Sequence, residues 1–261
     1  MKDLGSHRRH PAAIFIVMLL GLVATGGLYW LLAPKPAEAA VATADDLTAG
    51  RKLFLANCAT CHGLAGQGSK VAPTLVGVGA AAVDFQVGTG RMPLAGSGLP
   101  QAPRGNKVLF TEQQIASLAS YVATLGPGPA IPDSQYTKGD GDIARGNALF
   151  KVNCAMCHNF AGSGGALTRG KYAPNLHNVT GTHIYEAMVT GPQSMPVFND
   201  QNLTPTDKND IISYLHNLDK DKNPGGMNLG NLGPVSEGMF VWVFGLGLMI
   251  GAAVWLGAKA A

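Results

Sequence analysis

The chain has 261 residues, of which 46% are hydrophobic and only 13% are charged, and its formal net charge is +3. Apolar residues are too plentiful and the net charge is too small for an intrinsically disordered chain, and the 35 glycines lack the three-residue period of collagen. A charge of +3 is too weak for a nucleic-acid-binding protein unless it is concentrated, while the length and a mean hydropathy of +0.14 indicate about two domains with part of the chain in lipid.

The first predicted element is a transmembrane helix over residues 14–33, in which 19 consecutive residues from Ile14 carry no charge. As a helix these residues span about 28 Å, close to the hydrocarbon core of about 30 Å. Arg8 and Arg9 precede the helix and two aromatic residues end it, which predicts that the tail of residues 1–13 is cytoplasmic. A cleaved signal peptide is the alternative, but the apolar run is longer than the h-region of a signal peptide. In either case the residues that follow are exported.

The middle of the chain contains an internal duplication. The segment GRKLFLANCATCHG begins at Gly50 and GNALFKVNCAMCHN begins at Gly146, and the two match at eight positions with an offset of 96. The repeat continues downstream, where APTL recurs as APNL and the tripeptide RMP recurs as SMP. We therefore predict two domains, over residues 45–126 and 143–222, joined by a linker over 127–142 that is rich in Pro, Gly and Asp.

Each repeat is expected to begin and end with a helix. The opening helices have an apolar stripe at i, i+3 and i+7 that contains a glycine: Leu47, Gly50 and Phe54 in the first repeat, and Ile143, Gly146 and Phe150 in the second. The closing helices have clear start signals, Thr111 with Gln114 three residues later and Thr204 followed by Pro205. The glycine in each stripe predicts a close crossing between the opening and the closing helix.

All four cysteines lie in two copies of the pattern Cys-x-x-Cys-His: Cys58, Cys61 and His62 in the first repeat, and Cys154, Cys157 and His158 in the second. This is the attachment pattern of haem c. Two thiols three positions apart on a helical turn can reach both vinyl groups of one porphyrin, and the adjacent histidine then points its imidazole at the iron. The sequence thus predicts two covalently bound haem c groups, which supply much of the core that such short domains lack.

Three other interpretations of the cysteines are weaker. A shared zinc site is disfavoured because 92 residues separate Cys61 from Cys154, and zinc gives no reason for a histidine after each pair. A thioredoxin-like redox pair expects a strand before the motif, whereas a helix precedes both motifs here. Disulfides are permitted in an exported region, but bridges that close two-residue loops stabilise little.

Met92 and Met195 are the predicted sixth ligands of the two irons, because each precedes a proline in a loop at an equivalent position of the repeat. Met156 lies between two cysteines and cannot turn back to the iron, and Met188 lies in a helical pattern where we expect it to pack. With histidine and methionine at both axial positions, the iron has no open position for oxygen or peroxide. The predicted sites therefore pass electrons.

His177 and His183 are the alternative sixth ligands in the second repeat. Neither has a counterpart in the first repeat, and lone histidines are more often surface groups or groups that support a ligand. Pro73 and Pro174 follow the two motif histidines and offer carbonyl oxygens that can accept the ring N–H, although a simple loop turn explains them equally well.

The last predicted elements are a linker over residues 223–238 and a second transmembrane helix over 239–258, whose 20 residues carry no charge and which ends before Lys259. A buried core helix is the alternative, but one that is apolar on every face needs a large soluble core, which the flanking sequence does not offer. Gly247 and Gly251 form a GxxxG pattern that lets another helix approach closely.

The net charge indicates the topology of the chain. The two tails hold four basic residues, Lys2, Arg8, Arg9 and Lys259, against Asp3, and this difference equals the whole net charge of +3. Basic tails stay in the cytoplasm, so two crossings place everything between them on the exoplasmic (periplasmic) side of the cell membrane.

The chain resembles the dihaem cytochrome c subunit of the actinobacterial cytochrome bcc complex, a menaquinol:cytochrome c reductase. The resemblance covers nearly the full chain and is carried by both haem motifs, the segments APTLVGVGAAAVDFQVGTGRMP, APNL and IYEAMVTGPQSMPVFND, and one membrane helix at each end. Each half also resembles a class I cytochrome c. The implied fold is all-α, with two tandem class I cytochrome c domains flanked by an N-terminal and a C-terminal transmembrane helix.

The resemblance implies a place in the respiratory chain. In that family the subunit lies beside a cytochrome b subunit and a Rieske iron-sulfur subunit and joins a terminal cytochrome c oxidase in a supercomplex. Electrons would leave the Rieske cluster, enter the first haem, cross to the second and pass to the oxidase. The chain would then be the electron-transfer subunit of a translocase, with no substrate-converting site of its own.

Two other functions remain open from the sequence. One is a dihaem electron-transfer subunit of a different membrane oxidase or dehydrogenase, although a single N-terminal anchor would suffice for such tethering. The other is a dihaem peroxidase, which requires one haem with an open or displaceable axial position. The spin state of the oxidised iron separates the peroxidase from an electron carrier.

Overall fold

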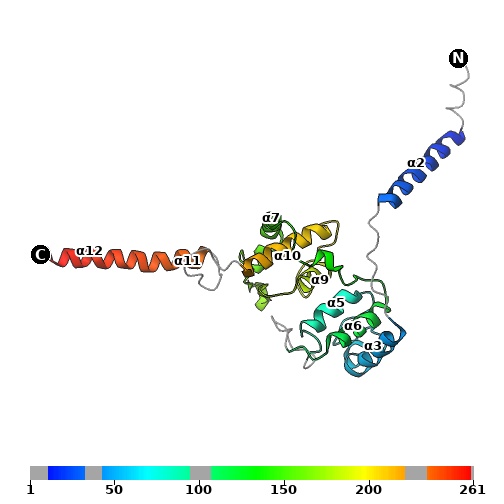
Figure 1. Cartoon of the computed structure of the whole chain (residues 1–261), viewed down its shortest axis with the longest axis horizontal. Helices are drawn as coiled ribbons and strands as arrows, with labels where there is room; N and C mark the ends of the chain where they lie inside the picture. Colours follow the sequence, from blue (N-terminus) through cyan, green and yellow to red (C-terminus); the bar gives the residue numbers. More distant parts are fainter. Residues whose placement is uncertain (1–10, 33–42, 95–106, 221–233, 260–261) are drawn as a thin grey trace, which may run out of the picture. The chain divides into compact units, whose positions relative to one another are not determined.

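The structure, a computed structural model, describes residues 11–32, 43–94, 107–220 and 234–259 (Figure 1). The chain divides into two compact units, one that ends at Glu38 and one that begins at Ala39. The described residues are mostly helical, which confirms the all-α fold class. Both cytochrome-like repeats lie in the second unit.

The two predicted membrane spans are helical. The first unit contains α2 (Pro11–Leu32), and the C-terminal span consists of α11 (Pro234–Val241), a π-helical turn η4 (Trp242–Leu246) and α12 (Gly247–Lys259) (Figure 1). In each span a stretch of at least 18 residues is long and apolar enough to cross a membrane, and the side chains of these stretches are not buried in the protein. Exposed apolar side chains all round a helix are typical of contact with lipid. Both helices begin a few residues earlier than predicted.

The first repeat contains the helices α3 (Ala44–Asn57), α4 (Ala59–His62), α5 (Gly79–Gly88) and α6 (Glu112–Ala123). Helix α6 packs against both α3 and α5. The capping box predicted at Thr111 and Gln114 begins α6, with each side chain accepting a hydrogen bond from the other residue's N–H. A second capping box, Thr43 with Asp46, begins α3 and was not identified from the sequence.

The segment before the second repeat contains η1 (Ser134–Tyr136), and the repeat itself contains α7 (Ile143–Asn153), α8 (Ala155–His158), β1 (Gly165–Ala166), η2 (Thr168–Gly170), β2 (Tyr172–Ala173), α9 (Gly181–Thr190) and α10 (Pro205–Lys220). Helix α10 packs against α7 and α9. Strands β1 and β2 pair antiparallel, with Gly165 opposite Ala173. The sequence did not predict this hairpin, because a two-residue strand is too short to show an alternating pattern.

The opening and closing helices cross at the predicted glycines. A Cβ atom on Gly50 would lie 2.0 Å from the backbone oxygen of Ser117 in α6, and one on Gly146 would lie 1.9 Å from the backbone oxygen of Asp210 in α10. These distances are far below van der Waals contact, so only glycine permits the crossings. The cores that they close contain the fully buried side chains of Phe54, Leu118, Phe150, Ile211 and Ile212.

The two repeats contact each other through α5 and α9 (Figure 1). The ring of His183 on α9 meets the ring of Phe85 on α5 edge to face, with centroids 6.2 Å apart. Gly88 of α5 leaves room for this imidazole, because a Cβ atom there would lie 3.0 Å from His183 Nε2. The contact therefore places a histidine of the second repeat directly against a helix of the first.

Asp207 joins the start of α10 to α7. Its carboxylate accepts hydrogen bonds from the Thr204 hydroxyl at 2.7 Å and from the Thr204 N–H at 3.0 Å, and it forms an ion pair with Arg145 of α7. Burial raises the pKa of Asp207, but the hydrogen bonds from Thr204 and the charge of Arg145 outweigh this effect and hold the pKa below its ordinary value. The contacts thus favour the charged form of the carboxyl in the folded state.

Replacing Asp207 by asparagine is expected to lower the stability of the second repeat by about 1 kcal/mol near neutral pH, because the amide keeps a hydrogen-bond acceptor but loses the negative charge that pairs with Arg145 and lies in the first turn of α10. A depressed pKa in the folded state stabilises the fold above the ordinary aspartate pKa, and this contribution disappears as the pH falls through the folded value. The stability difference between D207N and wild type should therefore shrink between pH 7 and pH 3. Thermal unfolding of the full chain, followed by haem absorbance, measures it.

The exposed Asp45 in the first turn of α3 provides the control, since D45N changes the same charge without removing a buried contact. A difference between D207N and wild type that is equal at pH 7 and pH 3 would contradict the assigned role of the Asp207 charge.

Candidate haem-binding sites

The two Cys-x-x-Cys-His motifs have the same local structure. Each first cysteine ends an opening helix, with the N–H of Cys58 donating to Phe54 O and that of Cys154 donating to Phe150 O, both at 2.8 Å. A short helix, α4 or α8, follows at once and contains the second cysteine and the histidine. Both cysteines and the histidine therefore lie on consecutive helical turns, as covalent attachment of one porphyrin requires.

The two motif histidines are buried and held by backbone carbonyl groups. His62 Nδ1 lies 2.8 Å from Pro73 O, and His158 Nδ1 lies 3.0 Å from Pro174 O. A carbonyl oxygen can only accept, so Nδ1 carries the proton and Nε2 presents a lone pair. Burial also lowers the pKa of His158, against a smaller opposing effect of the Pro174 carbonyl. The interpretation of these prolines as ring-orienting residues is thus confirmed, and the simple loop turn is not the whole explanation.

A cavity of about 520 Å³ lies in the second repeat and brings all four predicted site residues of that repeat together. Cys154, Cys157, His158 and Met195 line it, together with apolar side chains that include Ile184, Met188, Ile211 and Leu215. This volume is in the range of cofactor pockets. Two thiols, an imidazole with a free Nε2, a thioether and an apolar wall are the chemistry that a haem c needs, so the residues present fit this group.

The cysteine environment disfavours a charged thiolate. Burial, with a smaller effect of Cys157, raises the pKa of Cys154 to about 12, and burial with the effect of Cys61 raises the pKa of Cys58. A thioether bond to a haem vinyl group carries no charge and so removes this desolvation cost. The side chain of Cys61 is exposed, and that of Cys157 is partly exposed.

In the first repeat, Cys58 and Met92 pack against the same buried cluster, which is centred on Phe54 and Leu118. The N–H of Met92 donates to Gln86 O at 2.9 Å, which ties its loop to the end of α5. Residues 95–106, which follow this loop, lie outside the described part of the chain. The described residues thus place Met92 and Cys58 against the same core.

The loop that contains Met195 follows a tight helix end. Gly191 ends α9 in the left-handed conformation, with φ of 58°, and a Cβ atom there would lie 2.9 Å from Met195 O. The Phe198 N–H donates to Met188 O at 2.7 Å and returns the chain to α9. Met188 itself is buried in the core, as predicted, and Met156 is 91% exposed.

His177 has a partner that the sequence did not indicate. Its Nδ1 lies 2.7 Å from Asp219 Oδ1, and 42 residues separate the two in sequence. His177 lines the cavity, and its Nε2 is buried and has no hydrogen-bond partner among the residues that the structure describes. A carboxylate on Nδ1 and a free Nε2 are typical of a metal-ligating histidine, so His177 stays the alternative to Met195.

The first repeat contributes part of the wall of this cavity. Phe85, Gly88, Thr89 and Arg91 line it beside the residues of the second repeat. The Arg91 guanidinium lies over the Phe85 ring, 4.7 Å from its centroid, and burial lowers its pKa. Arg91 is the neighbour of Met92 in the sequence. The residue next to the predicted ligand of the first iron therefore lies at the second site.

Comparisons with known families support two cytochrome domains. The family model described as "Cytochrome c" matches residues 47–126. The family model described as "Cytochrome C oxidase, cbb3-type, subunit III" matches residues 141–215. Each match falls on one repeat, which supports one covalently bound haem c in each.

Known proteins are similar to the chain over about two thirds of its length or more. A protein of Mycobacterium leprae named "Cytochrome bc1 complex cytochrome c subunit" is 44% identical over 94% of the chain and 87% of that relative. A protein of Corynebacterium efficiens with the same name is 41% identical over 96% of the chain and 90% of its own length. The CcoP subunit of a cbb3-type cytochrome c oxidase from an Azospirillum species is 28% identical over 66% of the chain and 62% of that subunit.

Proposed function

This chain belongs to the family of cytochrome c subunits of the cytochrome bc1 complex, and we propose that it carries electrons from the Rieske and cytochrome b part of a menaquinol:cytochrome c reductase to the terminal cytochrome c oxidase of a respiratory supercomplex. Membership of this family identifies the chain as an electron-transfer cytochrome c. The passage of electrons from one repeat to the other is supported by one observation above all: residues of the first repeat, Arg91 among them, line the cavity of the second, as a continuous route through one chain requires.

Each repeat is one cytochrome c domain in this proposal. The first domain covers residues 45–126 and the second covers 143–222, with linkers over 127–142 and 223–238. The covalent attachment sites are Cys58, Cys61, Cys154 and Cys157, and the axial iron ligands are His62, Met92, His158 and Met195. A bound haem c supplies one-electron redox chemistry.

The chain's own residues suit electron transfer better than peroxide chemistry. The carbonyl groups of Pro73 and Pro174 hold the ligand imidazoles, and the wall of the second site is mostly apolar. Methionine on the opposite side of each iron would leave no open position for oxygen or peroxide. These features favour the electron carrier over the dihaem peroxidase.

Both termini lie in the cytoplasm in the proposed topology, and the two domains lie on the exoplasmic side. The two candidate spans at the ends of the chain and the basic residues of both tails support this orientation. The proposed partners are a cytochrome b subunit, a Rieske iron-sulfur subunit and a terminal cytochrome c oxidase.

The second domain is the proposed donor to the oxidase. It matches the family model of a cytochrome c oxidase subunit, whereas the first domain matches a general cytochrome c model. We therefore place the first domain on the side of the Rieske subunit. The two domains then act in the order in which they follow along the chain.

Two cysteine double variants in the native supercomplex test this order. The C154A/C157A variant lacks the second haem and should keep the quinol-dependent reduction of the first, while oxygen consumption is lost. The C58A/C61A variant should lose both oxygen consumption and quinol-dependent reduction of the remaining haem. Anaerobic difference spectra and an oxygen electrode measure the two quantities.

The M156L variant is the matched control, because Met156 lies between the cysteines of the second motif but is exposed. It should behave like wild type. Co-purification of the cytochrome b, Rieske and oxidase subunits in mild detergent shows whether each variant assembles. If a cysteine variant does not assemble, M92L or M195L, which keeps the covalent attachment of both haems, takes its place. Oxygen consumption by C154A/C157A, or purification of the wild-type chain without an oxidase, would overturn the proposal.

A further inference from the structure

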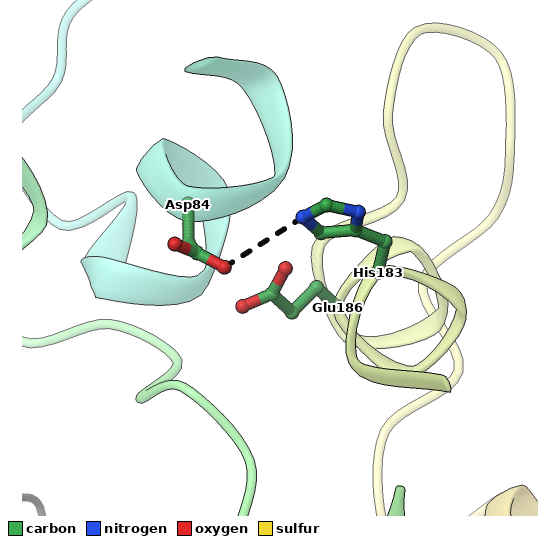
Figure 2. A group of neighbouring side chains, drawn as sticks. All are labelled: Asp84, His183 and Glu186. Atoms are coloured by element: carbon green, nitrogen blue, oxygen red, sulfur yellow. Dashed lines mark ion pairs between the residues drawn. The ribbon is translucent and has the colours of Figure 1, made fainter. Parts of the chain in front are cut away.

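Three side chains with metal-binding groups meet where the two repeats touch. Asp84 comes from α5 of the first repeat, and His183 and Glu186 come from α9 of the second (Figure 2). One ligand atom from each residue lies within 4.8 Å of the other two, and His183 Nε2 is 3.9 Å from Asp84 Oδ2. Figure 2 shows the Glu186 carboxylate pointing toward the Asp84 carboxylate, with the His183 ring beside both.

The buried side chain of Glu186 indicates that this cluster binds a ligand. Its side chain is completely buried, and neither carboxylate oxygen has a hydrogen-bond partner in the part of the chain that the structure describes. A buried carboxylate without a partner is costly unless a cation or a proton neutralises it. Burial, with smaller effects of the Asp84 carboxylate, raises the pKa of Glu186 to about 10. A buried acid in this position must therefore hold either a proton or a cation.

The ligand atoms that these three side chains offer favour a cation over a proton, and they also favour one kind of cation. His183 and Glu186 are three residues apart on α9, so both side chains lie on the same face of the helix. One imidazole nitrogen and two carboxylate oxygens are ligands that Zn²⁺ accepts, with water completing the tetrahedron, whereas Ca²⁺ and Mg²⁺ bind oxygen atoms. We propose that Asp84, His183 and Glu186 bind one zinc ion that joins α5 of the first repeat to α9 of the second.

The surroundings of His183 are compatible with this role. Burial lowers its pKa, Asp84 opposes that effect, and the nearby positive charge of Arg91 lowers the pKa further. The ring is therefore neutral near pH 7 and has a lone pair for a metal. Arg91 also repels a cation, but the two carboxylates carry two negative charges once both are ionised, against the single positive charge of Arg91.

An ion at this site would restrain the arrangement of the two repeats. Helices α5 and α9 form the contact between the repeats, so an ion bound by residues of both would hold the two domains in one arrangement. The separation of two redox sites depends on that arrangement. Zinc binding at this contact does not depend on which partner donates or accepts electrons.

Zinc binding to the full chain tests the proposal. The chain is purified in detergent with both haem c groups attached, so that no cysteine thiol is free to bind zinc, and it is treated with EDTA and then dialysed. Calorimetry with ZnCl₂ and elemental analysis should find one zinc ion per chain, and zinc should raise the temperature of thermal unfolding. Calcium added in place of zinc should bind at least tenfold more weakly.

Variants at the site and beside it distinguish the proposed ligands from other zinc sites. H183A and E186Q should each weaken zinc binding at least tenfold, and E186Q, which is neutral and of equal size, should stay folded without the ion. The matched control is H216Q, which removes another partly buried histidine of the second repeat, whose Nε2 lies 3.3 Å from Val179 O, and it should keep zinc binding. X-ray absorption at the zinc edge should show nitrogen and oxygen ligands.

Three results would overturn the proposal. The first is a wild-type chain that binds no zinc, and the second is zinc binding that survives E186Q and H183A or is lost in H216Q. The third is an infrared band of a protonated carboxylic acid that persists in the wild-type chain at saturating zinc and disappears in E186Q. That band would show that Asp84 and Glu186 share a proton in place of a metal ion.

Discussion

Replacing Met195 by leucine should abolish the methionine-to-iron absorption band of one haem in the near infrared and lower its reduction potential by an amount on the order of 0.1 V, within the range of about 0.8 V that axial ligands set. The thioether is a neutral, weakly donating ligand that favours the reduced iron, and leucine has no donor atom. Leucine has nearly the same volume, so the fold should survive. Met92→Leu should have the same effect on the other haem.

Near-infrared spectra and redox titrations of the full chain measure both effects. The control is Met188→Leu, because Met188 lines the same cavity but is buried on α9, where its role is packing. His177→Gln tests the alternative ligand, since His177 also lines this cavity and its buried Nε2 has no hydrogen-bond partner among the described residues. The assignment of Met195 is wrong if M195L leaves the near-infrared band unchanged while H177Q converts one iron to high spin.

Replacing Gly146 by alanine is expected to destabilise the second repeat by about 2 to 4 kcal/mol, the upper range for overpacking in a core. The new Cβ atom would lie 1.9 Å from Asp210 O and 2.5 Å from Asp210 C, and both are backbone atoms that cannot rotate away. Alanine favours a helix over glycine by about 1 kcal/mol, which offsets only part of the clash. Helices α7 and α10 must then separate and expose the core around Phe150.

Thermal unfolding of the full chain, followed by haem absorbance, measures this loss. Gly50→Ala should have a similar effect on the first repeat, because its Cβ atom would lie 2.0 Å from Ser117 O. Gly165→Ala is the matched control, since the nearest atom to a Cβ there is Cys157 O at 4.0 Å. If G146A unfolds at the same temperature as G165A, the helix crossing does not depend on glycine.

The sequence alone determined the features that depend on neighbouring residues. The two Cys-x-x-Cys-His motifs predict an attachment site because one helical turn places their side chains, whatever the rest of the chain does. The capping box at Thr111 and the glycine in each opening helix were likewise readable, because a cap or a close crossing needs only a few positions with fixed spacing. The two apolar spans followed from length and composition.

Only the tertiary structure decided which distant side chains meet. His177 pairs with Asp219, Arg91 of the first repeat lines the cavity of the second, and Asp84 lies against His183 and Glu186. None of these pairs has a characteristic spacing, because the residues come from different loops or different repeats. Their meeting depends on how α5 packs against α9 and how the loop before α9 folds over the cavity. Periodicity records the face of a helix that is buried, but it does not record the surface against which that face packs.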